Sequence, residues 1–158
     1  RADVTIGTFG KSFGGGGAFA AASGPLIDLV WNRGRALVFS TAMAPPLVSK
    51  ALWALPLVAA GPRTEALWAR ASAFRSALID EGVAPLAHSI GPIVPVPVGD
   101  PKVAIAAASR LREVGVLVHA MRPPTVPYGT SRLRCVVQAE HDLDSLRAAA
   151  HSIAGALR

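Results

Sequence analysis

The chain has 158 residues, of which 51% are hydrophobic and 16% are charged, and a mean hydropathy of +0.41, so an intrinsically disordered chain is excluded. The most apolar region, residues 36–60, is interrupted by Lys50 and by prolines, which excludes a membrane span of about 20 apolar residues. We therefore expect no membrane partner. The net charge of +6 comes without any run of basic residues, so we also expect no nucleic-acid partner.

Up to residue 61 the sequence alternates short apolar runs with turn signals. Two apolar runs flank the glycine-rich segment Thr8–Gly17, which cannot be helical, so both runs are predicted as strands. Pro25 follows a cap residue, Ser23 or Gly24, and this order is typical of a helix start. The predicted elements are strands at Val4–Ile6, Ala18–Ala22 and Ala36–Phe39, a helix from Pro25 to a stop at Gly34, and a helix at Leu47–Ala60 kinked at Pro56.

Beyond residue 61 the apolar positions follow clear helical or strand periods. Leu67, Ala71, Phe74 and Leu78 have helical spacing, whereas Leu133, Cys135 and Val137 alternate as one face of a strand. Two prolines restrict Pro92–Val98 to an edge strand. The predicted order is a helix from Thr64 to Gly82, the strand Pro92–Val98, a helix from Asp100 to Gly115, strands at Val116–His119 and Arg132–Gln138, and a helix from Asp142. This alternation is typical of a small α/β sandwich.

Gly61-Pro62 separates these two parts of the chain. We therefore predict a domain boundary there, between residues 1–61 and residues 62–158. The chain begins with Arg1 rather than methionine and enters an apolar segment at once, so we expect a chain cut out of a longer one.

Lys11 lies inside the glycine-rich segment TFGKSFGGGG. A phosphate-binding P-loop needs a glycine at position 5, where this chain has Thr5, and most of the glycines follow the lysine instead of preceding it. A nucleotide-binding module is therefore disfavoured. A lysine between two apolar strands suits Schiff-base formation, which requires a neutral amine. A solvated loop lysine is an equal alternative on these grounds alone.

Three separated segments resemble the α-oxoamine synthases, which are pyridoxal-phosphate enzymes of fold type I. TFGKSFGGGGAFAAAS (residues 8–23) is similar to the lysine segment of that family, and FSTAMAPP (residues 39–46) is similar to the segment that follows it. RPPTVPYGTSRLR (residues 122–134), followed by AEHD (residues 139–142), resembles the C-terminal signature of the members that act in biotin biosynthesis. The three matches occur in the order of the family and cover the whole chain.

The resemblance implies an α/β fold type I PLP-dependent transferase. Residues 1–61 would be the C-terminal part of its large cofactor domain, and residues 62–158 its small C-terminal α/β domain. The implied reaction is the decarboxylative condensation of L-alanine with a pimeloyl thioester, carried by coenzyme A or a carrier protein, to 8-amino-7-oxononanoate. A cytoplasmic homodimer is also implied.

The resemblance assigns four site residues. With pyridoxal 5'-phosphate as cofactor, Lys11 would be the catalytic lysine that binds the cofactor aldehyde, and Thr8 a hydroxyl donor to its phosphate. Thr125 would contact substrate, and Arg134 would bind the carboxylate of the amino acid, because a guanidinium can hold a carboxylate with two parallel hydrogen bonds.

Two alternatives stay open. A sister enzyme of the glycine C-acetyltransferase or 5-aminolevulinate synthase type shares the lysine segment and uses another amino acid. A non-catalytic dimerisation or scaffold domain of the same fold has no need of both Lys11 and Arg134. In the family, the groups that stack on the cofactor ring and keep its nitrogen protonated lie upstream of the lysine segment, so we expect the isolated chain to be inactive.

The other reactive side chains are predicted to be structural. The histidines (His88, His119, His141 and His151) have no metal-ligand spacing, so we expect no metal and assign them to packing or the surface. Trp31, Trp53 and Trp68 are expected in the core or at a dimer contact. The single Cys135 cannot form an internal disulfide, which fits a reducing compartment, and its strand position predicts a buried thiol.

Overall fold

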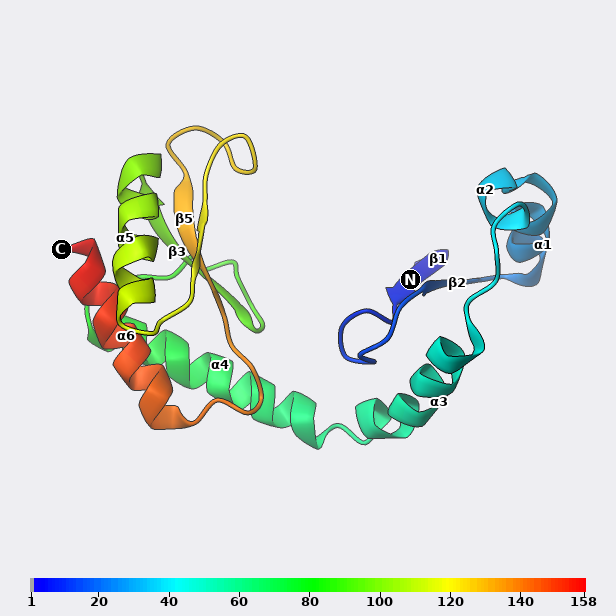
Figure 1. Ribbon diagram of the computed structural model, residues 1–158, viewed down its shortest axis with the longest axis horizontal. Helices are drawn as coiled ribbons and strands as arrows, with labels where there is room; N and C mark the ends of the chain where they lie inside the picture. The colour runs from blue at the N-terminus through cyan, green and yellow to red at the C-terminus, as the bar shows by residue number, and fades with distance from the viewer. Residues whose placement is uncertain (1) are drawn as a thin grey trace. The chain divides into compact units, whose positions relative to one another are not determined.

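The computed structural model describes residues 2–158, so the expectation drawn from Arg1 lies outside the described residues. The chain contacts divide it into two compact units, Arg1–Gly61 and Pro62–Arg158 (Figure 1). In the part of the chain that the structure describes, no helix is both long enough and apolar enough to cross a bilayer.

The first unit is a β-hairpin followed by three helices. The two strands predicted from the apolar runs are present as β1 and β2. They pair antiparallel, with Thr8 opposite Ala18 and Val4 opposite Ala22. The elements of this unit are β1 (Val4–Thr8), β2 (Ala18–Ala22), α1 (Gly24–Arg33), α2 (Arg35–Val38) and α3 (Pro45–Ala59). Helix α1 begins after Ser23 and ends at Gly34, also as predicted.

The strand predicted at Ala36–Phe39 is wrong, because these residues belong to the short helix α2 and its C-cap. The backbone N–H groups of Leu37 and Val38 both donate to the carbonyl of Gly34, at 2.9 and 3.0 Å. These local hydrogen bonds therefore make Arg35–Val38 a helical turn directly after α1. A four-residue apolar run has no period of its own that distinguishes a strand from one helical turn.

The first unit buries few apolar side chains of its own. Among its described residues only Ala51 and Ala54, both on α3, are buried hydrophobic residues. Trp31, Phe39 and Trp53 are 59%, 76% and 71% exposed. The tryptophans are therefore not core residues, contrary to one of the two places predicted for them, and Trp68 of the second unit is likewise 50% exposed.

The second unit is a two-layer α/β sandwich, as predicted (Figure 1). Its three-stranded antiparallel sheet has the order β3-β5-β4, and the proline-containing strand β3 lies at an edge. The elements are α4 (Pro62–Asp80), β3 (Ile93–Gly99), α5 (Pro101–Glu113), β4 (His119–Met121), β5 (Ser131–Val136) and α6 (Leu143–Leu157).

Alternate residues of β5 separate the two faces of this sheet. Leu133 and Cys135 are buried against the three helices, together with Phe74, Leu111 and Ile153 from α4, α5 and α6. Arg134 and Val136 on the other face are exposed, so this face is open in the described chain. The alternation predicted for residues 132–138 is confirmed, and it fixes which side chains of β5 can meet a ligand.

Strand β4 begins later than predicted, at His119 instead of Val116. The N–H of Val116 donates to the carbonyl of Leu111 at 2.8 Å, and Gly115 has a φ of +82°. Both features belong to the left-handed C-cap of α5, which uses the Val116 N–H that a strand would need for pairing. The apolar residues 116–118 therefore precede β4 and are not part of it.

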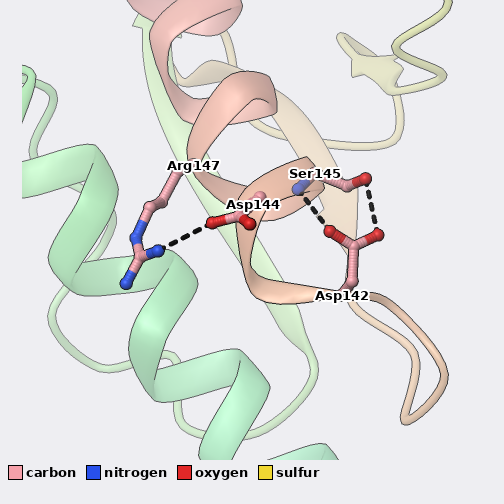
Figure 2. A network of polar contacts seen from close by, with 4 residues as sticks. All are labelled: Asp142, Asp144, Ser145 and Arg147. Carbon is pink, nitrogen blue, oxygen red and sulfur yellow. Dashed lines mark hydrogen bonds and ion pairs between the residues drawn. The ribbon is translucent and has the colours of Figure 1, made fainter.

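Helix α6 begins at a cap made by Asp142 (Figure 2). Its carboxylate accepts hydrogen bonds from the hydroxyl and from the backbone N–H of Ser145, each at 2.7 Å. These two bonds, the hydroxyl first, hold the pKa of Asp142 below its ordinary value. Two residues further on, Asp144 accepts a hydrogen bond from Arg147 at 2.8 Å, which is an exposed ion pair.

The Asp142 cap predicts a pH-dependent loss of stability in an Asp142→Ala variant. The pKa of Asp142 is lower in the folded than in the unfolded chain, so its stabilisation is fully present above the unfolded pKa of about 3.9. That stabilisation disappears as the pH falls through the lowered folded-state pKa. We expect the urea midpoint of Asp142→Ala to lie below that of the parent near neutral pH, and the difference between the two midpoints to shrink in acid. Asp144→Ala is the control. A midpoint difference between Asp142→Ala and the parent that is the same at all pH values would contradict the account.

Candidate active site

Thr8 and Lys11 lie together on the β1–β2 hairpin of the first unit. Thr8 is the last residue of β1, and Lys11 follows in the connecting loop; both are exposed. The loop is closed by hydrogen bonds from the N–H of Phe9 to the Gly17 carbonyl at 3.0 Å and from the N–H of Gly14 to the Lys11 carbonyl at 2.8 Å. Thr8 and Lys11 are therefore three residues apart on one hairpin whose backbone is closed by hydrogen bonds.

The glycines after Lys11 allow α3 and the segment before it to approach the loop. Gly17 has a φ of +96°, and a Cβ there would clash with the Met43 sulfur. A Cβ at Gly16 would be 3.5 Å from Leu47 Cδ1. The space that the glycines leave is thus occupied by Met43 and Leu47. The second motif of the resemblance, residues 39–46, therefore packs beside the lysine loop.

Arg134 lies on the open face of the sheet in the second unit. Its strand neighbours are Pro95 on β3 and His119 on β4, each directly opposite it in register. Within residues 2–158 no side chain or carbonyl accepts a hydrogen bond from its guanidinium, whereas Arg132 on the same face donates to the carbonyl and the hydroxyl of Thr130 at 3.0 and 3.2 Å. Arg134 is therefore the β5 arginine that is available to an anion.

Thr125 lies in the loop between β4 and β5, which begins at Arg122. The N–H of Thr125 donates to the Arg122 carbonyl at 3.0 Å, and its side chain is exposed. The end of the loop is fixed by Thr130, whose hydroxyl donates to the Pro127 carbonyl at 2.8 Å. Thr125 and Arg134 thus belong to the second unit, and Thr8 and Lys11 to the first.

Cys135 is buried, as its position in the strand predicted. Burial raises the pKa of its thiol to about 12. Because the thiolate is the reactive form, less than about 0.1% of the thiol is reactive at mildly alkaline pH. We expect a thiol reagent to label native protein at least about a hundredfold more slowly than urea-unfolded protein. Equal labelling rates before and after unfolding would contradict this burial.

The histidines lie at separate places. His151 Nδ1 is 3.0 Å from a carboxylate oxygen of Glu81, and His141 Nδ1 is 3.3 Å from the N–H of Gln138. In residues 2–158 no group of three His, Cys, Asp or Glu side chains is placed to hold a metal ion. His119 differs from the others because, on β4, it is directly opposite Arg134 on the neighbouring strand β5. The predicted strand boundaries do not give this pairing, because it depends on the register between the two strands.

The sequence matches known proteins along nearly its whole length. A family model for class I and II aminotransferases matches residues 1–153. Curated relatives include the 8-amino-7-oxononanoate synthases of Anaeromyxobacter dehalogenans (strain 2CP-1), 46% identical over 143 residues, and of Geobacter sulfurreducens, 42% identical over 156 residues. The alignments cover 90% and 96% of this chain but only 36% and 39% of the relatives. These relatives confirm the resemblance that the three motifs indicated.

Solved structures agree with this similarity. A serine palmitoyltransferase of Sphingomonas wittichii is 29% identical, with a TM-score of 0.88 over 98% of this chain and 40% of that one. An SPT structure with a PLP internal aldimine has the same identity and TM-score and covers 98% of this chain and 39% of its own. The 8-amino-7-oxononanoate synthase of Francisella tularensis, 20% identical, has a TM-score of 0.85 over 96% of this chain and 44% of that one. The fold type predicted from the sequence is confirmed.

Proposed function

The chain belongs to the aminotransferase class I and II family, and from that premise we propose that it carries the cofactor lysine and the carboxylate-binding arginine of an α-oxoamine synthase. The proposed reaction is the decarboxylative condensation of L-alanine with a pimeloyl thioester, which gives 8-amino-7-oxononanoate, carbon dioxide and the free thiol carrier. It would serve biotin biosynthesis, with pyridoxal 5'-phosphate as cofactor. The names of the relatives at 46% and 42% identity support this choice of product, from which we infer the substrates. The observation that carries the proposal is the exposed Lys11 on a hydrogen-bonded hairpin beside Thr8.

The side chains of the hairpin fit this cofactor, which offers an aldehyde and a phosphate. The Lys11 amine is a nucleophile for the aldehyde carbon, and the Thr8 hydroxyl is a donor to a phosphate oxygen. When bound, the cofactor withdraws electrons from the bonds at the substrate α-carbon. Lys11, once its amine is free, can remove a proton from that carbon and return one as a general base and acid.

Arg134 and Thr125 orient the amino acid in this proposal. The guanidinium of Arg134, which is exposed and has no hydrogen-bond acceptor among residues 2–158, would hold the substrate carboxylate with two parallel hydrogen bonds and so fix the direction of the α-carbon bonds. Thr125 supplies a hydroxyl from the neighbouring loop. These roles are binding and orientation, so their loss raises KM more than it lowers kcat.

We also assign the two units to parts of the proposed enzyme. Residues 1–61 are the C-terminal part of the cofactor domain, and residues 62–158 are the small C-terminal domain. The exposed apolar side chains of the first unit, Trp31, Phe39 and Trp53 among them, support an additional protein surface against it, which in this proposal includes the second subunit of a cytoplasmic homodimer.

Product analysis tests the proposed function. The protein as encoded by its gene, loaded with pyridoxal phosphate, is incubated with pimeloyl-CoA or pimeloyl-carrier protein and, separately, L-alanine, glycine or L-serine. We expect 8-amino-7-oxononanoate from L-alanine, detected by mass spectrometry, and no turnover by residues 1–158 expressed alone. Product from glycine or L-serine in preference to L-alanine would assign the chain to a sister enzyme, and no product from any amino acid would contradict the proposal.

A further inference from the structure

The open face of the second unit places a second nitrogen donor beside Arg134. His119 on β4 is directly opposite Arg134 on β5, and residues directly opposite in an antiparallel pair project from the same face with Cβ atoms about 5 Å apart. Both side chains are exposed. The third residue in this row across the sheet, Pro95, has no side-chain donor or acceptor. His119 and Arg134 are therefore the polar pair of that row.

The surroundings of this pair favour an anion. Both residues belong to the lining of a cavity of about 480 Å³, which also includes Phe74, Cys135 and Ile153 from the buried side of the sheet. Its described lining includes no Asp or Glu. The remaining polar side chains of the lining are Gln138, His141 and Ser145, which are neutral or basic. Arg132, the next arginine on the same face, is held by Thr130. An anion bound at Arg134 thus has one further side-chain donor directly across from it, the His119 ring.

We propose that His119 is a substrate-binding residue that donates a hydrogen bond from its ring to the same amino-acid carboxylate that Arg134 holds. This inference rests on the proposed role of Arg134. A carboxylate has two oxygens with about four acceptor sites, so a guanidinium that uses two of them leaves room for an imidazole N–H. The pair fixes the carboxylate from two strands, which restrains its rotation more than one side chain can.

Two variants separate hydrogen bonding from packing. His119→Phe keeps a ring that can stack on the guanidinium but has no N–H, whereas His119→Gln keeps a donor and has no ring. The ligand is propionate, which is L-alanine without its amino group, and its binding to the full-length protein is measured by calorimetry, so that no turnover is needed. The KM for L-alanine is measured in parallel. Met121→Leu is the matched control, because Met121 is on the same strand as His119 and is opposite Arg132 on β5.

We expect His119→Phe to weaken propionate binding and to raise the KM for L-alanine about tenfold, because a hydrogen bond to a charged group is lost. His119→Gln is expected to stay within about threefold of the parent, and kcat at saturating L-alanine is expected to change little in either variant. Parent-like propionate affinity in His119→Phe would overturn the inference. If Arg134→Met weakens propionate binding and His119→Phe does not, only the role of His119 fails; if neither variant weakens it, the proposed carboxylate site fails as well.

Discussion

Replacing Lys11 with alanine is expected to lower kcat for synthesis of the amino ketone by about 10⁴-fold. Lys11 is the proposed nucleophile for the cofactor aldehyde and the proposed general base, and a positioned base alone contributes about 10²- to 10⁴-fold. Substrate binding at Arg134 is untouched, so the KM for L-alanine should change little. The measurement is steady-state release of the thiol carrier by the full-length protein saturated with pyridoxal phosphate.

Lys102→Ala is the control for this experiment. Lys102 is exposed in the first turn of α5 in the second unit, and it has no role in the proposed chemistry. Its variant is expected to have the kcat of the parent. A Lys11→Ala enzyme that kept more than about a tenth of the parent kcat would show that Lys11 is a solvated loop lysine, which the sequence alone left as an equal alternative.

Arg134→Met is expected to raise the KM for L-alanine by about 100-fold. Two charge-assisted hydrogen bonds to the carboxylate are lost, and each contributes about 1.5 kcal/mol or more. Arg134→Lys keeps the charge but not the planar pair of donors, so its KM should lie between those of Arg134→Met and the parent. The KM for the pimeloyl thioester is the internal reference, since in the proposal Arg134 holds the carboxylate of L-alanine and not the free carboxylate of the pimeloyl chain.

Arg147→Met is the matched arginine control for the second unit. Arg147 forms an exposed ion pair with Asp144 on α6, and such pairs contribute little to stability (Figure 2). Its kinetic constants should equal those of the parent. An Arg134→Met enzyme with an unchanged KM for L-alanine would assign Arg134 to the sheet face as a structural residue and would remove the carboxylate site from the proposed mechanism.

The sequence predicted best those features whose cause is local. Asp100 and Asp142 were both recognised as helix starts, and each carboxylate accepts the backbone N–H bonds that define an N-cap. The edge position of β3 followed from Pro95 and Pro97, which lack an N–H to pair on one side. The buried face of β5 followed from strict alternation.

Features that depend on competition between neighbouring elements were not predictable in the same way. Residues 36–38 are helical, and Phe39 is their C-cap, because the Gly34 carbonyl accepts the N–H groups of Leu37 and Val38. Residues 116–118 do not belong to β4, because the cap of α5 uses the Val116 N–H. The opposition of His119 and Arg134 follows from the β4–β5 register, which no local pattern encodes. Motif resemblance predicted Lys11 and Arg134 as site residues, whereas only the register placed His119 opposite Arg134.

The most direct test of the central claim is the site of cofactor attachment. The full-length protein is incubated with pyridoxal phosphate, reduced with borohydride and digested, and the modified peptide is sequenced by mass spectrometry. The account predicts one pyridoxyl group per chain, on Lys11. It predicts none in a sample to which borohydride is added before the cofactor. Modification at Lys50 or Lys102 instead, or no stable adduct at all, would contradict the claim that the glycine-rich hairpin holds the cofactor lysine.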